Sequence, residues 1–221
     1  MGSSRLKGKV LKKISGKSSL EHIIERASLS KNIDDILVAT SNNSLDDKIV
    51  KLCNKLKVVS YRGSEDDVLE RFYNISKKYP HQNILRLTAD CPLHDPDVID
   101  EITSFFLQNN FDYVSNSIYR TFPVGLDTEI FTFESLEKSF FSAKQKEHRE
   151  HVTLYINGKF KNLANGKFRV YNYQSKGNFS FLRWTLDTSD DLKRIRKLMQ
   201  LSKDSYSWLN LVSKLLKIKF K

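Results

Sequence analysis

The sequence predicts a single α/β domain with a mixed, mostly parallel sheet and helices on both of its faces. Over residues 18–106, short apolar runs alternate with amphipathic segments of helical spacing, which is the pattern of strands joined by crossover helices. The 221 residues suit one sizeable core. We find no internal repeat and no Pro/Gly/Ser-rich linker that would divide residues 1–221 into two domains.

Apolar residues recur at helical spacing in the segments 18–27, 44–56, 64–75 and 95–106. Ser18 and Glu21 have the spacing of a capping box, so a helix is expected to begin there. Ser64 is expected to cap the third helix. Asp95 followed by Pro96 suits the N-cap and first turn of the fourth.

Apolar runs between these helices predict strands at 36–39, 58–59 and 84–88, followed by less regular strands at 113–115, 129–131, 168–171 and 182–186. Two further helices are expected near the end of the chain, where residues 202–221 form a possible C-terminal helical extension. Ligands of open parallel sheets bind beyond the carboxyl ends of the strands. The polar loops that follow these strands are therefore where we expect a functional site.

Composition narrows the class of protein. A net charge of +11 suits attraction to nucleic acid, an anionic membrane surface or a phosphorylated metabolite, but also a solvated basic surface. No recognition-helix, zinc-finger or RNP-type motif accompanies the charge, so no nucleic-acid partner is expected.

No apolar stretch is long enough for a membrane span, and a cytoplasmic location is expected. Cys53 and Cys91 are expected to be reduced thiols.

A basic, glycine-containing loop near the start of the chain is the first candidate site. Its backbone amides, together with Arg5 and Lys9, suit the binding of a polyphosphate. The loop is not a Walker P-loop, because five residues separate Gly2 from Gly8 and Val10 follows Lys9. A basic surface turn is an equally good interpretation of the composition.

Acidic side chains follow two of the predicted strands. Asp90 comes just after the strand at 84–88, and Asp187 follows the strand at 182–186. Carboxylates at strand ends can hold Mg²⁺, although either Asp can instead cap the turn or helix that follows. Two such carboxylates and a basic loop together suit phosphoryl-group transfer, which needs metal bridging of phosphate oxygens and nearby cations.

Two weaker patterns remain open. Asp127 and Glu129 have strand spacing on one face, which suits sugar hydroxyls or a water-bridged metal, but also the solvated side of an edge strand. His148 and His151 share a helical face, yet their spacing is not that of a zinc site.

Eight collinear segments resemble one family, the cytidylyltransferases related to spore-coat polysaccharide biosynthesis protein F, cousins of the CMP-sialic acid and CMP-Kdo synthetases. The resemblance extends to about residue 200. The segments are Gly2-Ser-Ser-Arg-Leu-Lys-Gly-Lys-Val-Leu11, Val38-Ala-Thr-Ser41, Arg62-Gly-Ser-Glu-Asp-Asp-Val-Leu-Glu-Arg71, Arg86-Leu-Thr-Ala-Asp-Cys-Pro-Leu93, Asp112-Tyr-Val-Ser-Asn116, Gly125-Leu-Asp-Thr-Glu129, Arg149-Glu-His-Val152 and Leu182-Arg-Trp-Thr-Leu-Asp-Thr188.

The resemblance implies a three-layer α/β/α, glycosyltransferase-A-like fold, a possible homodimer, and transfer of CMP from CTP to a sugar or sugar acid in the biosynthesis of cell-surface glycans. Asp90 and Asp187 would be the Mg²⁺ ligands, and Arg5 and Lys9 would grip the triphosphate. The implied nucleotide-binding residues are Gly2, Ser3, Ser4, Arg5, Gly8, Lys9, Thr40 and Ser41. The implied acceptor-binding residues are Arg71, Asp127, Glu129 and His151.

The sequence departs from the family pattern twice. Lys7 stands where the family has Pro, so the turn is less restricted and gains a charge. Family members also have an apolar strand, ending in Ala-Arg, ahead of the Met-Gly-Ser motif. The sequence begins at Met1, so we expect a central strand to be missing and Met1 to be an internal residue of a longer protein.

Three other functions remain open. An enzyme of the same fold can use another nucleotide, or transfer a sugar from a nucleotide sugar, with the same strand-end carboxylates. A basic nucleic-acid-binding module would use the Lys-rich C-terminal segment. A catalytically inactive relative, kept for an interaction, is the third.

Overall fold

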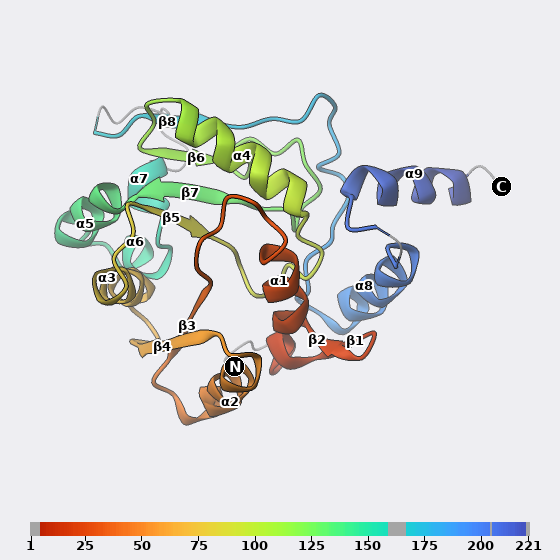
Figure 1. Cartoon of the computed structure of the whole chain (residues 1–221), viewed down its shortest axis with the longest axis horizontal. Coiled ribbons are helices and arrows are strands. Elements are labelled where there is room, and N and C mark those ends of the chain that lie inside the picture. The colour runs from red at the N-terminus through yellow and green to blue at the C-terminus, as the bar shows by residue number, and fades with distance from the viewer. Residues whose placement is uncertain (1–4, 159–166, 204, 220–221) are drawn as a thin grey trace.

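The computed structural model of the chain describes residues 5–158, 167–203 and 205–219, and Figure 1 shows the arrangement of their elements. The strands are β1 (Lys13–Ile14), β2 (Lys17–Ser18), β3 (Leu37–Ser41), β4 (Val59–Gly63), β5 (Asn83–Arg86), β6 (Tyr113–Ser115), β7 (Glu129–Thr132) and β8 (Val170–Asn172). The α-helices are α1 (Ser19–Ala27), α2 (Asp47–Leu56), α3 (Val68–Lys78), α4 (Pro96–Gln108), α5 (Phe133–Ser142), α6 (Lys146–Glu150), α7 (Leu154–Asn157), α8 (Ser189–Leu201) and α9 (Trp208–Lys219). Short 3-10 helices lie at η1 (Lys9–Leu11) and η2 (Ser44–Asp46).

Local capping signals fix the start of several helices. Ser18 caps α1 through the expected capping box, in which its hydroxyl accepts from Glu21 N while the Glu21 carboxylate accepts from Ser18 N. Asp95 caps α4, with Pro96 in the first turn. Both predictions are confirmed, because these bonds join residues two or three apart and need no distant partner.

The start of α3 differs from the prediction. The helix begins at Val68, and its N-cap is Asp67, whose side chain accepts from Glu70 N at 2.8 Å. The expected cap, Ser64, instead accepts from Asp67 N in the turn before the helix. Ser and Asp are comparably good caps. Because the hydrogen bond between Ser64 and Asp67 N forms a turn ahead of the helix, Asp67 is the residue that caps it.

The main sheet has the strand order β5-β7-β6-β8 and lies between two layers of helices. Successive side chains along a strand point to opposite faces of the sheet. Val114 and Ile130 pack into the core cluster that contains residues of α4, α8 and α9, whereas Tyr113 and Phe131 pack into the cluster on the α3, α5 and α7 side. The expected α/β/α layers are confirmed. Strand β7 runs antiparallel to both of its neighbours, and β6 and β8 are parallel.

Two sequence-based expectations about strands need correction. Residues 182–186 make only an isolated bridge between Val124 and Arg183, not a strand. Strand β7 begins at Glu129, so Asp127 lies in the loop before it and the two carboxylates do not share a strand face.

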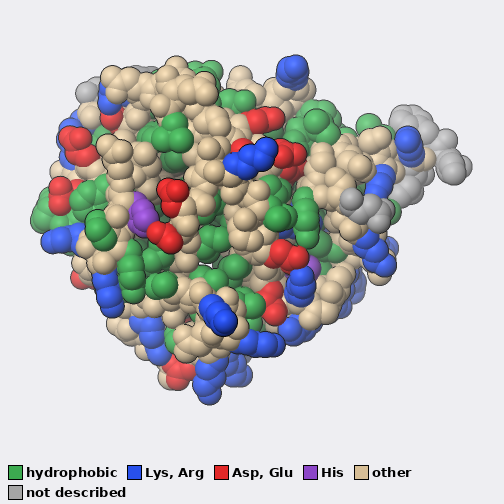
Figure 2. Space-filling model, viewed as in Figure 1, with side chains coloured by type: hydrophobic (Ala, Val, Ile, Leu, Met, Phe, Trp, Pro, Cys, Tyr) green, Lys and Arg blue, Asp and Glu red, His purple; other side chains and the backbone are tan. Residues whose placement is uncertain are grey.

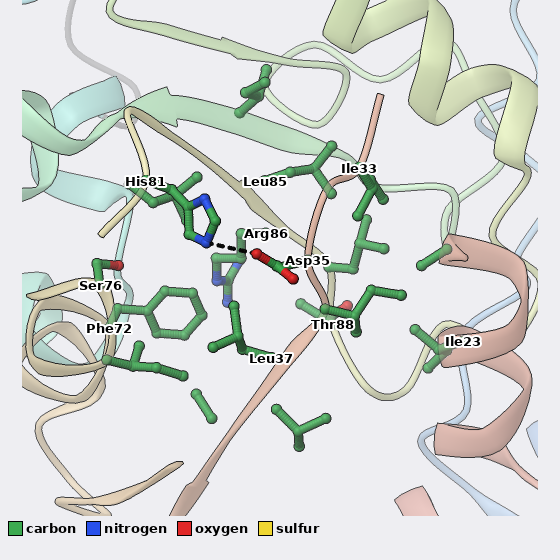
Figure 3. A pocket seen from close by; sticks show the side chains of 18 of the residues that line it. Ile23, Ile33, Asp35, Leu37, Phe72, Ser76, His81, Leu85, Arg86 and Thr88 are labelled. Atoms are coloured by element: carbon green, nitrogen blue, oxygen red, sulfur yellow. Dashed lines mark ion pairs between the residues drawn. The ribbon is translucent and has the colours of Figure 1, made fainter. Parts of the chain in front are cut away.

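Strands β3 and β4 form a separate parallel ladder, and a cavity of about 630 Å³ lies between β3 and β5. Helices α1 and α3 supply apolar side chains to its walls, including Ile23 and Phe72 (Figure 3). An ion pair of 3.3 Å joins His81 and Asp35 just ahead of the two strands. The space-filling view shows hydrophobic side chains at the hollowed centre of this face (Figure 2).

The C-terminal helix is part of the packed structure. Trp208, in the first turn of α9, donates its backbone N–H to Asp95 Oδ2 at 2.6 Å. Its ring lies against Phe122 and Phe179, with ring centroids 5.5 and 5.0 Å away. The predicted C-terminal helix is therefore present, and it closes one end of the main core.

Two predictions about composition can be compared with the described residues. Cys53 and Cys91 are buried free thiols, as expected. In residues 5–158, 167–203 and 205–219, none of the helices has the length and apolar character needed to cross a membrane.

Candidate functional site

Asp90 and Asp187 lie together because the two segments that precede them are hydrogen-bonded to each other. The backbone N–H of Leu186 donates to Asp90 O at 2.8 Å. The loop after β5 is also tied to α1, since Ser19 Oγ donates to Ala89 O at 3.0 Å. A capping box then fixes the start of α8 directly after Asp187, with Thr188 as the N-cap. Both carboxylates thus have positions set by their backbones.

Lys9 lies between these carboxylates. Gly8, in the left-handed region with φ 64°, turns the chain into η1. The Lys9 ammonium donates to Asp90 Oδ2 at 2.6 Å and to Asp187 Oδ1 at 2.9 Å. Arg5 approaches Asp187 Oδ1 at 3.3 Å, and Arg183 donates to Asp187 Oδ2 at 2.6 Å. The structure therefore brings the predicted basic loop to the two predicted carboxylates.

The charges at this site stabilise one another. Burial disfavours the charged form of Asp90, but the hydrogen bond and charge of Lys9 outweigh it and hold the pKa of that carboxyl below its usual value. Burial likewise lowers the pKa of Lys9, and its bonds to Asp90 and Asp187 more than reverse this, so that the pKa is raised. Both groups are therefore charged at neutral pH.

The donor set fits a hard divalent cation such as Mg²⁺. An oxygen of Asp90 and an oxygen of Asp187 both lie within 3 Å of one point, the Lys9 ammonium. No group of three or more His, Cys, Asp or Glu side chains suited to a metal occurs among the described residues. Mg²⁺ commonly binds through one or two carboxylates and completes its shell with water and substrate phosphates. Two convergent carboxylates are sufficient for such a site.

The remaining predicted nucleotide-binding residues divide into two groups. Gly2, Ser3 and Ser4 lie outside the described residues. Thr40 and Ser41 end β3, and both hydroxyls donate to Asp46 Oδ2 at 2.7 Å. Burial would raise the pKa of Asp46, but these bonds and others lower it. The two hydroxyls therefore brace the turn after β3.

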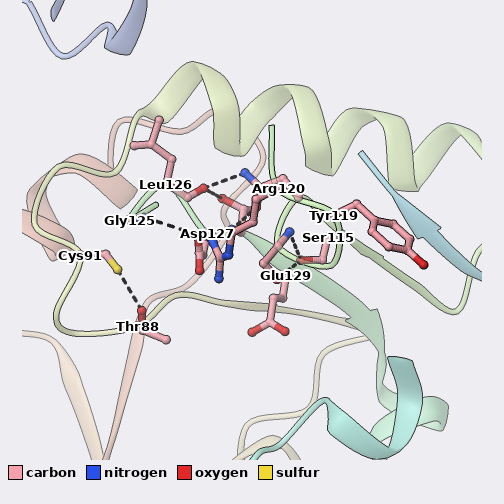
Figure 4. A network of polar contacts seen from close by, with 12 residues as sticks. Thr88, Cys91, Ser115, Tyr119, Arg120, Gly125, Leu126, Asp127 and Glu129 are labelled. Carbon is pink, nitrogen blue, oxygen red and sulfur yellow. Dashed lines mark hydrogen bonds and ion pairs between the residues drawn. The ribbon is translucent and has the colours of Figure 1, made fainter. Parts of the chain in front are cut away.

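Two predicted acceptor residues have partly buried arginine partners, and Figure 4 shows one of these pairs, Asp127 with Arg120. Asp127 forms an ion pair with Arg120. Glu129 is buried, pairs with Arg86, and accepts from Tyr113 OH at 2.7 Å and Thr153 Oγ1 at 2.6 Å. Burial opposes the charge of Glu129, but Arg86 and these donors lower its pKa. Both carboxylate oxygens of Glu129 thus have partners within the protein.

The other two predicted acceptor residues lie on different elements. Arg71, on α3, donates to Ser64 O at 2.7 Å, lines the cavity between β3 and β5, and has a buried Nε atom with no hydrogen-bond partner. His151 follows α6 and is exposed. Among the described residues, no hydrogen bond or ion pair joins any two of the four predicted acceptor residues.

Three arginines with charged partners in or near the site had no role assigned from the sequence. Arg183 contacts Asp187, Arg120 contacts Asp127, and Arg86 contacts Glu129. Only Arg183 left a local signal, because it stands four residues before Asp187 in an extended segment. The other pairs join residues from different segments, and no spacing rule reveals them.

Comparison with known proteins gives the family. A family model described as Cytidylyltransferase matches residues 1–213. The chain belongs to the cytidylyltransferase family. This cytidylyltransferase is 44% identical over 201 residues to an uncharacterised protein of Methanocaldococcus jannaschii, covering 90% of this chain and 79% of the other. It is 32% identical over 208 residues to the spore coat polysaccharide biosynthesis protein SpsF of Bacillus subtilis, covering 90% and 83%.

Solved structures agree with the fold of this cytidylyltransferase. A cytidylyltransferase from Leptospira borgpetersenii superposes with a TM-score of 0.90 at 32% identity, covering 99% of this chain and 91% of the other. A CMP:2-keto-3-deoxy-manno-octonic acid synthetase complexed with CTP superposes with a TM-score of 0.65 at 16% identity, covering 90% and 94%. The second likeness shows a common nucleotidyltransferase fold.

Proposed function

We propose that this cytidylyltransferase transfers CMP from CTP to a hydroxyl of a sugar or sugar acid and releases pyrophosphate, in the synthesis of a cell-surface glycan. The main support is the convergence of Asp90 and Asp187 at one point, surrounded by the cations Lys9, Arg5 and Arg183. This arrangement suits a triphosphate and a divalent metal together. The glycan pathway follows from the name of the Bacillus relative, and the sugar acid from that of the octonic acid synthetase.

In this proposal Lys9, Arg5 and Arg183 bind the triphosphate, while Asp90 and Asp187 hold Mg²⁺. When held there, Mg²⁺ would screen phosphate charge and would lower the pKa of the attacking hydroxyl. The acceptor oxygen forms a bond to the α-phosphorus, the bond from that phosphorus to the β-phosphate oxygen breaks, and pyrophosphate leaves with its electron pair. The hydroxyl proton passes to solvent, and no covalent enzyme intermediate is needed.

For the acceptor, we propose that Asp127 and its partner Arg120 provide the polar contacts. Both side chains retain exposed surface, 23% for Asp127 and 35% for Arg120, so a ligand can reach them. Glu129, being enclosed, holds Arg86 in place. Arg71 and His151 remain candidates for outer contacts, through an unsatisfied Nε atom and an exposed ring respectively.

Nucleotide binding and product analysis test this function. We expect CTP with Mg²⁺ to raise the melting temperature by about 5–10 °C at saturating concentration, because ligand at 100 times Kd adds about 2.7 kcal/mol. ATP, GTP and UTP should give smaller shifts. Asp90→Asn and Asp187→Asn should each lower the rate of pyrophosphate release by a factor on the order of 10² or more.

Asp190→Asn is the matched control, since Asp190 lies three residues from Asp187 but is 77% exposed and pairs only with Lys193 among its described contacts. It should keep wild-type turnover. Full activity of either Asp90→Asn or Asp187→Asn would remove that carboxylate from the mechanism. Release of a nucleoside diphosphate from a nucleotide sugar, without pyrophosphate release, would replace the proposal by a glycosyltransferase.

A further inference from the structure

Lys9 occupies the position where its two carboxylate partners converge. Its ammonium is 2.6 Å from Asp90 and 2.9 Å from Asp187. A Mg²⁺ ion bound by the same oxygens requires contacts of about 2.0–2.1 Å. An ion at that distance from both oxygens would lie beside the ammonium that they already hold, and the two positive charges would repel each other strongly in so small a space. One cation or the other can use this pair of oxygens.

The surroundings make the competition strong. The side chains of Lys9, Asp90 and Asp187 are 19%, 26% and 14% exposed, so solvent screens their charges less than on an open surface. Leaving either the two carboxylates or the Lys9 ammonium partly buried without an opposite charge would cost free energy. Any cation that takes the carboxylates must therefore be matched by a new anionic partner for Lys9.

The backbone allows Lys9 to change partner without moving the loop. Lys9 begins η1 after the left-handed Gly8, and its N–H donates to Leu6 O at 3.1 Å. The charge itself sits at the end of a flexible four-carbon stem. Arg5 and Arg183, which are 65% and 44% exposed, mark the solvent side of Asp187 where an anion would meet further positive charge.

We propose that Lys9 exchanges partners during ligand binding, leaving Asp90 and Asp187 for the triphosphate when a divalent cation takes the two carboxylates. The inference rests on the proposed function for the identity of the triphosphate. Each ligand alone meets a penalty: the metal must displace Lys9, and the nucleotide finds Lys9 engaged. Together they remove each other's penalty, so metal and CTP bind cooperatively, and Lys9 is the residue that couples them.

The test measures Mn²⁺ binding, as a spectroscopic substitute for Mg²⁺ at oxygen ligands. The concentration of free Mn²⁺ is measured by electron paramagnetic resonance, without nucleotide and with saturating CTP, for the wild type and for Lys9→Met. Lys9→Met should bind Mn²⁺ alone on the order of tenfold more tightly than the wild type. The tightening of Mn²⁺ binding by CTP should be large in the wild type and much smaller in the variant.

Two further variants separate charge from structure. Lys9→Arg keeps a competing cation and should keep weak Mn²⁺ binding. Lys12→Met removes the same charge three residues further along the chain and should behave as the wild type. Equal or weaker Mn²⁺ binding by Lys9→Met, in protein with a cooperative melt, would overturn the proposal, because Lys9 would then be only a structural link.

A measurement on the wild type covers the case in which Lys9→Met does not fold. Lysines are labelled by reductive ¹³C-methylation, and the Lys9 signal is assigned from Lys9→Arg. The signal should shift when Mg²⁺ and CTP are added together. An unchanged signal on ligand binding overturns the exchange. If CTP binds to none of the proteins, the proposed function fails, whereas the Mn²⁺ titrations without nucleotide still decide whether Lys9 competes with the metal.

Discussion

His94 is a buried side chain that should make the stability of this protein depend on mildly acidic pH. It is fully buried, and neither ring nitrogen has a hydrogen-bond partner. Its backbone carbonyl accepts from Arg26, whose positive charge is also buried. Burial is the main reason that the pKa of His94 is lowered to about 4. The folded protein therefore favours the neutral ring.

Because this folded-state pKa lies below the unfolded value of about 6.5, the unfolded chain takes up the proton first as the pH falls. The stability from neutral His94 is complete above about pH 6.5 and is lost as the pH falls through about 4. Between these values we expect His94→Leu to lose about 3 kcal/mol less unfolding free energy than the wild type. Urea unfolding at a series of pH values measures how the unfolding free energy of the wild type and of His94→Leu changes with pH. An identical pH dependence in the two proteins would contradict the lowered pKa of His94.

Single residues also show where sequence patterns fail. Asp127 and Glu129 stand two apart, and period-two spacing predicts a common face. The first lies in a loop beside Arg120, and the second is enclosed with Arg86 and Tyr113. The pattern gives the spacing but not the point at which the strand begins, and the partners of the two carboxylates come from other segments of the chain.

At the scale of elements, the crossing of residues 122–126 with residues 182–186 holds Asp187 in place. Trp184 N donates to Val124 O at 2.7 Å, and Val124 N donates to Leu182 O at 2.9 Å. Gly125 has φ +113°, and a Cβ atom added there would lie 2.8 Å from the backbone carbon of Trp184. The crossing therefore requires glycine at residue 125, both for its backbone conformation and for its close approach.

We expect Gly125→Ala to destabilise the protein by more than the 1–2 kcal/mol that left-handed strain alone costs, because the segment before Asp187 must also shift. Gly16→Ala is the matched control: Gly16 has φ +88°, and an added Cβ would meet nothing within 4 Å. Thermal and urea unfolding compare the two. Equal losses would show that the contact with Trp184 contributes nothing.

At the scale of the whole molecule, the sheet is interrupted by the cavity between β3 and β5 (Figure 3). Strand β3 pairs only with β4, and β5 only with β7, within the described residues. Strand β7, by contrast, pairs on both sides. The strand edges of β3 and β5 that face the cavity should therefore be less protected against local opening than β7.

Amide hydrogen exchange tests this expectation. We expect the amides of β3 and β5 on the cavity side to exchange at least about tenfold faster than those of β7, because opening there breaks fewer hydrogen bonds and less packing. Residue-resolved exchange by NMR gives the comparison, with β6 as a second strand paired on both sides. Equal protection of β5 and β7 would show that the cavity edges are not weak points of the fold.

The sequence by itself determined the layered α/β architecture and several helix starts, such as those at Ser18 and Asp95. It also indicated the chemistry of the basic loop and of the acidic residues at 90 and 187. These signals are local: caps act over three residues, and apolar periodicity reports which face of one element is buried.

Only the tertiary structure decided which of these groups meet. Lys9 contacts Asp187 across 178 positions of sequence, and Glu129 contacts Arg86 across 43. Such contacts depend on the order of strands in the sheet and on the crossing at Gly125, which no local pattern contains. Burial and charge at the site follow from those long-range contacts, because a side chain's environment is set by every segment that packs around it.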